Sequence, residues 1–320
     1  MNNPYASHLN PALFSKEVEL KPTRNGFGEG LVTAATANED VVGLSADLTE
    51  STRMDKFANS WPDRFFQVGV AEQNMMGIAA GLALSGKIPF IASYATFSPG
   101  RNFDQLRVSV CYSQANVKII GCHAGISVGP DGATHQALED IAMTRALPGL
   151  VVISPADSIE AAKATVAAAN YQGPVYIRLS RDKTPIIHTE QSPFQIGKGT
   201  LLRDGADLTI IATGPLLYQA LLAAETLTQE KIQVSVVNLS TIKPLDEELL
   251  LRVGKHTKAV VTVEEHQING GLFGAISEFY SLHLPLPIEP VAMPDTFGES
   301  GEPLELMKKF GLLARDIRAA

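Results

Sequence analysis

Short apolar runs alternate with longer helix-like stretches along nearly the whole chain. The runs are rich in β-branched residues and predict strands at 41–45, 66–69, 89–93, 117–121, 150–154 and 174–179. Stretches rich in Ala and Leu between them predict helices at 72–85, 102–113, 138–146 and 157–170. Runs such as 117–121 are apolar almost throughout, as expected for strands buried on both faces. The pattern predicts an α/β fold with helices on both faces of a parallel sheet.

This alternation breaks at residues 183–198, which contain two prolines, scattered polar side chains and no sustained period. A second series follows, with strands predicted at 208–213, 233–239, 259–264 and 288–292 and helices at 216–227, 246–253 and 271–281. We therefore expect two consecutive α/β domains. Their predicted order is an N-terminal extension at 1–21, a first domain at 22–182, a linker at 183–198 and a smaller domain at 199–320.

Composition excludes several classes of protein. The 320 residues are 45% hydrophobic and carry 26 basic against 34 acidic side chains, a net charge of −8, which argues against a nucleic-acid binder. No uncharged apolar run approaches the ~18 residues that span a bilayer, and no signal segment begins the chain. Cys111 and Cys122 are too few for a disulfide framework or a metal knuckle. These features predict a soluble cytoplasmic protein that binds no membrane and no metal of its own.

Glu72 is the first candidate for chemistry, because it stands where a strand gives way to a helix. Open α/β sheets bind ligands at this edge, although a glutamate in a first turn can simply complement the helix dipole. The helix that follows is almost wholly apolar, so we expect it to be buried together with the carboxylate. A buried carboxylate needs a partner or a ligand that donates a hydrogen bond.

A Gly-rich loop at 121–136 is the second candidate. It follows a predicted strand and contains His123, Asp131 and His135, in a spacing that matches no zinc pattern. Its length and polar side chains favour a small-molecule site over a plain connection. Tyr94 and Phe97 follow another strand end, where Phe97 could stack on a flat heterocycle.

Two further glycine motifs are better explained by a structural role than by ligand binding. The run at 26–30 looks like a dinucleotide fingerprint, but no predicted strand precedes it. The segment at 264–271 ends a strand and begins a helix, and a tight turn with close helix packing accounts for its glycines.

Four segments in this order resemble the C-terminal half of transketolase. They are LSADLTES at 44–51, VGVAEQN at 68–74, HAGISVGPDGATHQ at 123–136 and FGESG at 297–301. The resemblance runs from about Pro22 to the end with few gaps, and the combination of AEQN with GPDGATHQ is specific. The family's N-terminal domain, which holds the pyrophosphate of thiamine diphosphate and its metal, has no counterpart. The chain therefore resembles the C-terminal subunit of a split transketolase.

The resemblance implies a cofactor and a role for each matching residue. Glu72 matches the catalytic glutamate that hydrogen-bonds the aminopyrimidine ring of thiamine diphosphate, and Phe97 the aromatic side chain that stacks on this ring. Asp47 and Tyr94 fall at the same cofactor edge. The remaining matches concern the substrate: His123 and His135 assist proton transfer and contact hydroxyls or phosphate, Asp131 reads a hydroxyl, and Arg24, Ser51 and Arg181 form a sugar-phosphate clamp.

The implied activity is transfer of a two-carbon ketol unit between sugar phosphates. An N-terminal partner subunit would hold the pyrophosphate and Mg²⁺ or another divalent cation, in a dimer of heterodimers. Three alternatives remain. A deoxyxylulose-5-phosphate synthase shares the short segment after Phe97, but those known to us lack a histidine at the position of His123. The β subunit of a 2-oxo acid dehydrogenase shares the two-domain plan but not GPDGATHQ. A non-catalytic scaffold would have no use for the combination of Glu72, His123, Asp131 and His135.

Overall fold

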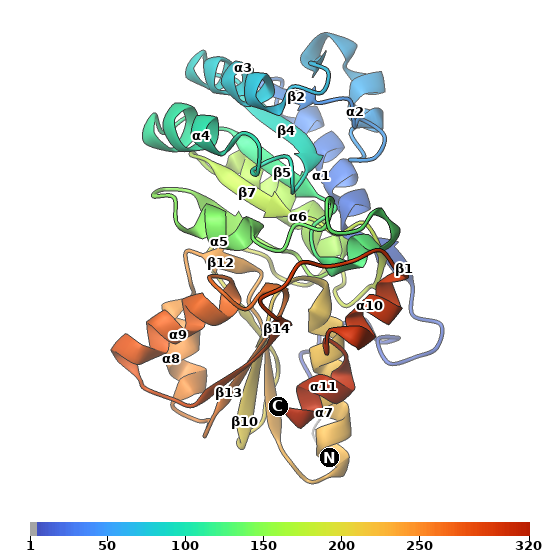
Figure 1. Cartoon of the computed structure of the whole chain (residues 1–320), viewed down its shortest axis with the longest axis vertical. Helices are drawn as coiled ribbons and strands as arrows, with labels where there is room; N and C mark the ends of the chain where they lie inside the picture. The colour runs from blue at the N-terminus through green and yellow to red at the C-terminus, as the bar shows by residue number, and fades with distance from the viewer. Residues whose placement is uncertain (1–4) are drawn as a thin grey trace.

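The computed structural model describes residues 5–320 and contains two α/β units, each built around its own sheet. The first unit lies above the second in Figure 1, and the C-terminus lies at the lower unit. The predicted fold class, two consecutive α/β domains with mainly parallel sheets, is confirmed.

The first unit is built on a seven-stranded sheet. Its strand order is β12 (Thr241–Lys243), β6 (Val151–Ile153), β7 (Val175–Arg178), β5 (Lys118–Cys122), β4 (Ile88–Tyr94), β2 (Val41–Ser45) and β3 (Phe65–Gln67). All neighbours are parallel except β12, which runs antiparallel to β6. Because β12 comes from the second half of the chain, it joins the two units through backbone hydrogen bonds.

Helices cover both faces of this sheet. One face packs against α1 (Thr23–Ala37), α2 (Asp55–Ser60) and α6 (Ser158–Asn170). The other packs against α3 (Glu72–Leu84), α5 (Asp140–Arg145) and a helix that begins as α4 (Phe103–Gln105) and continues with π geometry as η2 (Leu106–Tyr112). Two 3-10 turns, η1 (Pro62–Arg64) and η3 (Ile126–Asp131), lie in the connections.

Helix α1 was not predicted, and its glycines explain why the run at 26–30 is not a dinucleotide site. A Cβ on Gly26 or Gly30 would collide with the backbone of α6, so these residues allow the two helices to pack closely. Asp157 caps α6 by accepting the backbone N–H of Glu160, as its position before the helix indicates.

The second unit has a five-stranded sheet in the order β14 (Ile288–Met293), β13 (Val260–Gln267), β10 (Leu208–Ala212), β11 (Val234–Asn238) and β9 (Thr200–Arg203). Only β9 is antiparallel. One face packs against η4 (Gly214–Leu216), α7 (Leu217–Gln229), α10 (Pro303–Lys309) and α11 (Ala314–Ala319), and the other against α8 (Glu247–Gly254) and α9 (Leu272–His283). Glu264 accepts the first backbone N–H groups of α9, and a Cβ on Gly271 would collide with this carboxylate.

The segment before the first predicted domain packs against the second unit, whereas residues 183–198 contact both units, with Phe194 and Ile196 against the core of the first. Leu9 and Leu13 are buried in its core, while β1 (Leu20–Pro22) pairs with β8 (Lys183–Pro185). Residues 183–198 connect the units, but their first half is not an exposed connection, because Ile187 and His188 are buried. Residues 1–4 of the predicted extension lie outside the described part of the chain.

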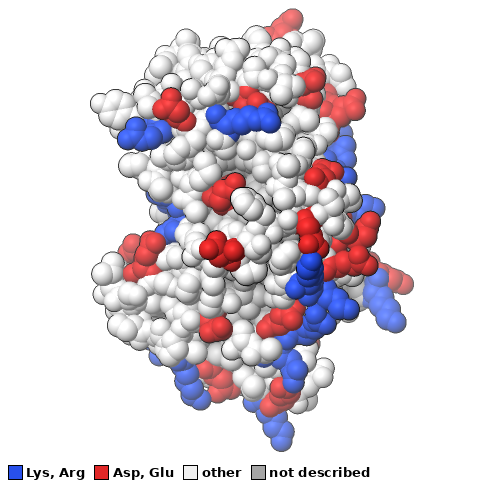
Figure 2. Space-filling view, in the orientation of Figure 1, with Lys and Arg blue, Asp and Glu red and all other residues white. Residues whose placement is uncertain are grey.

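Helix α3 differs from the sequence expectation. Met75, Met76 and Ala79 face the sheet, but no atom lies within 4 Å of where a Cβ on Gly77 would stand. The expectation that the whole helix is buried is therefore wrong for this chain alone. Figure 2 shows few charged side chains over α3. Between residues 5 and 320, no helix is both long and apolar enough to cross a membrane.

Candidate functional site

The predicted site residues gather at the carboxyl edge of the first sheet. Asp47 follows β2, Glu72 follows β3, Phe97 follows β4, His123 follows β5 and Arg181 follows β7. Because all five strands are parallel, their carboxyl ends meet at one edge and bring these residues together from distant parts of the chain.

Glu72 is 3% exposed at the first turn of α3, so the prediction of a buried carboxylate is correct. Its partner in this chain is Arg101, whose Nη1 lies 3.3 Å from each carboxylate oxygen. The same guanidinium lies over the ring of Phe97, with Cζ 4.0 Å from the centroid. Arg101 was not predicted as a site residue. The only signal for it in the sequence is that a basic residue follows Phe97 closely.

Four rings form one continuous group beside this ion pair. Tyr94 stacks on His123 with centroids 3.8 Å apart and lies 5.9 Å from Phe97 in a nearly parallel orientation. His135 meets the Phe97 ring edge-on at 5.3 Å, and its Nδ1 lies 2.8 Å from Thr134 Oγ1. Residues from β4 and from the Gly-rich loop thus pack together, as expected for one binding surface.

His123 is buried and has a left-handed backbone, with φ of 56°. Its Nε2 lies 3.3 Å from Nη1 of Arg24, while its Nδ1 is buried without a hydrogen-bond partner. Burial, together with the nearby charges of Arg24 and Arg181, lowers the pKa of His123 to about 3. The ring is therefore neutral at physiological pH and can exchange hydrogen bonds with an uncharged ligand group.

A cation-rich pocket of 450 Å³ continues from His123. Arg24 and Arg181 both line it, which brings two of the three predicted clamp residues together. Arg24 Nη1 donates to the backbone oxygen of Ser51 at 2.7 Å, and Arg181 Nη1 donates to that of Val128 at 2.8 Å. Arg53 also lines this pocket and was missed, because no sequence pattern separates it from other surface arginines.

Two predicted residues lie at the margin of the group. Asp47 has φ of 61°, and its N–H donates to Gln67 Oε1 at 2.7 Å; with Ser51 it lines a separate pocket of 260 Å³. Asp131 is exposed at the end of η3 and makes no hydrogen bond or ion pair with another predicted site residue in the described chain. Asp131 therefore lies in the same loop as His123 and His135 but does not contact either of them through a hydrogen bond or ion pair.

The motif at 297–301 braces the Gly-rich loop from the second unit. Gln136 Nε2 donates to the backbone oxygen of Glu299 at 2.9 Å, and a Cβ on Gly298 would collide with the Gln136 side chain. A Cβ on Gly132 would lie 2.6 Å from Ser300 Oγ. These close approaches explain why two distant glycine-containing motifs occur in the same chain.

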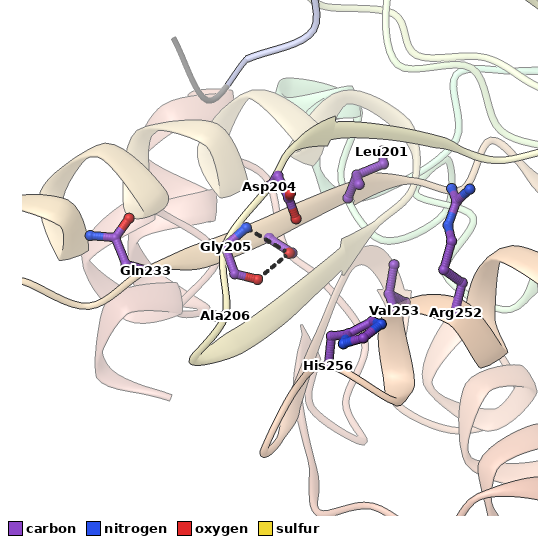
Figure 3. A pocket seen from close by; sticks show the side chains of 9 residues that line it. Leu201, Asp204, Gly205, Ala206, Gln233, Arg252, Val253 and His256 are labelled. Carbon is purple, nitrogen blue, oxygen red and sulfur yellow. Dashed lines mark hydrogen bonds between the residues drawn. The ribbon is translucent and has the colours of Figure 1, made fainter. Parts of the chain in front are cut away.

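Another cavity lies away from this edge and contains none of the predicted residues. Its 770 Å³ are bordered by β9, the loop after it, β11 and α8 (Figure 3), with Arg252 and His256 pointing from the helix side. Ser235 fixes one wall by hydrogen bonds to the backbone of Gly205. No group of three or more His, Cys, Asp or Glu within residues 5–320 is arranged to hold a metal ion.

Comparison with known proteins identifies the family. Residues 20–186 match the transketolase pyrimidine-binding domain, and residues 197–317 match the transketolase C-terminal domain. The chain belongs to the transketolase family. Membership implies thiamine diphosphate as the cofactor. The buried carboxylate of Glu72 beside the ring of Phe97 provides a hydrogen-bond acceptor and a stacking surface that suit the cofactor's pyrimidine ring.

Several transketolase relatives match nearly end to end. A putative transketolase C-terminal section from Methanocaldococcus jannaschii is 47% identical over 300 residues, covering 93% of this chain and 94% of the relative. A 6-deoxy-6-sulfo-D-fructose transketolase subunit from a Clostridium species is 42% identical, with 96% of both chains covered. One subunit of an apulose-4-phosphate transketolase from Phocaeicola vulgatus is 37% identical, covering 90% of this chain and 93% of the relative.

Solved transketolase structures support the same family assignment. A split-gene transketolase, described as an inactive beta4 tetramer, superimposes with a TM-score of 0.88 at 45% identity and covers 93% of this chain and 96% of its own. The Campylobacter jejuni transketolase superimposes with a TM-score of 0.81 at 25% identity. This match covers 97% of this chain and 48% of that one. The chain is thus a transketolase subunit of the split type, and the dehydrogenase and deoxyxylulose synthase alternatives are not favoured.

Proposed function

We propose that this chain supplies the pyrimidine-binding side of a thiamine diphosphate site together with the groups that bind the substrate. Its reaction transfers a two-carbon ketol unit between phosphorylated sugars of the pentose phosphate type. The observation that carries this proposal is the unbroken row of contacts from Glu72 through Arg101, Phe97, Tyr94 and His123 to Arg24. This row connects a buried carboxylate to an anion-binding pocket, so a cofactor and the far end of a sugar phosphate fit one surface.

When bound, the cofactor supplies the nucleophilic carbon that accepts the ketol unit. Glu72 would accept a hydrogen bond from a pyrimidine ring nitrogen that carries a proton, as in the imino tautomer, and Phe97 would hold one face of this ring. Both residues are already oriented for these roles, because Glu72 is fixed at the first turn of α3 and Phe97 packs against Tyr94 and His135. The fold therefore orients the ring with little rearrangement of the carboxylate.

His123 and His135 handle protons and hydroxyl groups at the reacting end of the sugar. Because Nε2 of the neutral His123 ring accepts from Arg24, the unpaired Nδ1 carries the hydrogen and can donate to a substrate oxygen. His135 stands at the open edge of Phe97, where a substrate bound next to the pyrimidine would lie. Asp131 and Asp47 contribute only if the loops that carry them move inward when substrate and partner bind.

The terminal anion of the sugar belongs in the pocket lined by Arg24 and Arg181, with Ser51 close to it. Arginine suits this role because its planar fork can donate two parallel hydrogen bonds to phosphate oxygens. Two relatives are named for sugars that carry a phosphate or a sulfo group, which supports an anionic substrate in this pocket.

We further propose an N-terminal partner that holds the pyrophosphate and a divalent cation such as Mg²⁺, in a dimer of heterodimers. The uncovered face of α3, where Ile78 and Leu84 are exposed, is available to a partner. The proposed function is tested by measuring ketol transfer from a ketose phosphate to an aldose phosphate, with this chain, the partner, cofactor and Mg²⁺ together. We expect turnover only when all four are present; robust transfer by this chain alone with cofactor would refute the shared site.

A further inference from the structure

Three arginines converge on the cation-rich pocket, although a simple clamp would need two. Arg24, Arg53 and Arg181 line it together with Lys183, and only Asp182 and Glu302 oppose them. Four cations against two carboxylates leave an excess of two positive charges. Such an excess in one hollow is unfavourable unless an anion neutralises it, because like charges at close range repel.

None of the three arginines forms a salt bridge within the described residues. Each instead donates through one nitrogen to an uncharged acceptor. Arg24 donates to the backbone oxygen of Ser51, and Arg181 donates to that of Val128. Arg53 Nε donates to Asn25 Oδ1 at 2.9 Å. These contacts fix the side chains and leave other N–H groups for a ligand. Nε of Arg24 is buried without a partner.

Arg53 is carried on a turn built to bring it against α1. Its φ is 67°, a conformation that a non-glycine residue adopts only at a cost. A Cβ on Gly28 would lie 2.6 Å from the Arg53 carbonyl oxygen, so only glycine lets α1 approach the turn so closely. The first turn of α1 contributes Arg24 and Asn25 to the same pocket and contains no acidic residue.

We propose that Arg53 is a specificity-determining residue for the remote anion of the substrate. With Arg24 and Arg181 it offers a third guanidinium, which matches the pocket to a doubly charged phosphate monoester in preference to a singly charged sulfonate. The excess of two positive charges equals the charge that a phosphate monoester approaches at pH 7, and its three terminal oxygens can engage three donors. This inference rests on the proposed function, because it assumes that the pocket receives the substrate's far end.

The kinetic test compares three donor ketoses of equal length that end in a phosphate, a sulfonate or a hydroxyl, using the reconstituted complex. In Arg53→Gln we expect the KM for the phosphate donor to rise roughly 10- to 100-fold, as for the loss of a charge-assisted hydrogen bond. The KM for the sulfonate donor should rise less than about 3-fold, because the pocket without Arg53 keeps an excess of one positive charge, which still matches a singly charged group. The KM for the hydroxyl donor should not change. Arg53→Lys should recover part of the phosphate preference.

Lys56→Gln is the matched control, because Lys56 is an exposed cation three residues away that does not line the pocket. It should leave the KM for all three donors unchanged. Equal KM increases for the three donors in Arg53→Gln would identify a structural role and overturn the proposal. An unchanged ratio of the phosphate to the sulfonate KM would overturn it as well.

Binding of small probes separates this inference from the proposed function. Calorimetric titration of the full chain with methyl phosphate and methanesulfonate should show tighter binding of methyl phosphate, and Arg53→Gln should abolish the difference. If the complex transferred no ketol unit but this result held, the ketol-transfer proposal would fail while the role of Arg53 stood. If the wild-type chain did not discriminate between the two probes, the role of Arg53 would fail whatever the complex catalyses.

Discussion

The guanidinium of Arg101 lies against the carboxylate of Glu72, with Nη1 3.3 Å from each carboxylate oxygen, and covers the ring of Phe97 at 4.0 Å. A planar cation thus occupies both the acceptor and the stacking surface that we assign to the cofactor's pyrimidine ring. Arg101 and the pyrimidine ring cannot both bind the Glu72 carboxylate and cover the Phe97 ring at the same time. Cofactor binding must therefore displace the Arg101 side chain, which is half exposed and free to move outward.

Arg101→Ala should consequently strengthen cofactor binding by the assembled complex. Because a partly exposed ion pair contributes little, we expect the apparent Kd for thiamine diphosphate to fall about two- to five-fold. Fluorescence or circular dichroism titration with the cofactor measures this directly. Arg107→Ala, which removes another exposed arginine from the same segment, should have no effect. Weaker binding in Arg101→Ala would mean that Arg101 helps to hold the cofactor instead of competing with it.

A buried histidine between the two units should contribute stability that is lost in alkaline solution. His188 Nδ1 lies 3.0 Å from Asp157 Oδ2, and its Nε2 is 4.0 Å from Glu160 Oε1. Burial opposes the cation, but the two carboxylates prevail and raise the pKa of His188 from 6.5 to about 9. The cation therefore stabilises the fold fully below pH 6.5, and this stabilisation is lost as the pH rises through 9.

The measurement is the midpoint of thermal unfolding between pH 6 and 10 for the wild type and His188→Gln. The wild type should be more stable than His188→Gln at pH 6, and this difference should shrink by on the order of 2–3 kcal/mol as the pH rises to 10. Other titrating groups are common to both proteins and cancel in the comparison. His256→Gln, at an exposed histidine that follows α8, should follow the wild-type curve. Parallel curves for the wild type and His188→Gln would contradict the assignment.

Gly298→Ala should disturb the Gly-rich loop from outside the first sheet. The new methyl group would collide with Gln136 and Ile126, which lie in the loop that carries His123 and His135. Overpacking of this kind costs about 1–3 kcal/mol of unfolding free energy, and displacement of the histidines should lower kcat. Gly274→Ala in α9 is the control, because its Cβ would meet only the far ends of two side chains, Arg145 Nη1 at 3.3 Å and Glu278 Oε1 at 3.8 Å. Wild-type kcat in Gly298→Ala would show that the loop does not depend on this brace.

The sequence predicted those parts of the site that depend on a single strand end. Glu72, Phe97, His123 and Arg181 each follow a recognisable apolar run, and parallel pairing of the strands then brings them to one edge. The sequence also predicted the two-unit fold, because strands buried on both faces produce clear apolar runs.

Contacts between side chains on different elements could not be predicted in this way. The pairing of Arg101 with Glu72 depends on the path of the chain after Phe97, and Arg53 reaches the pocket through a turn with positive φ next to Gly28. Helix α1 was missed because its glycines, which serve close packing on α6, weaken the helical pattern. Helix α3 has the apolar composition of a buried helix, although one of its faces is uncovered. Composition alone does not tell whether the residues that cover such a face belong to the same chain or to a partner.

The central claim is that Glu72 acts on the cofactor, and Glu72→Gln in the reconstituted complex tests it most directly. The substitution keeps the size of the side chain but removes the carboxylate, so folding and assembly with the partner should be retained. We expect kcat for ketol transfer to fall roughly 10²- to 10⁴-fold, as for the loss of a proton-transfer group. A complex that assembles normally and turns over at close to the wild-type rate would contradict the account.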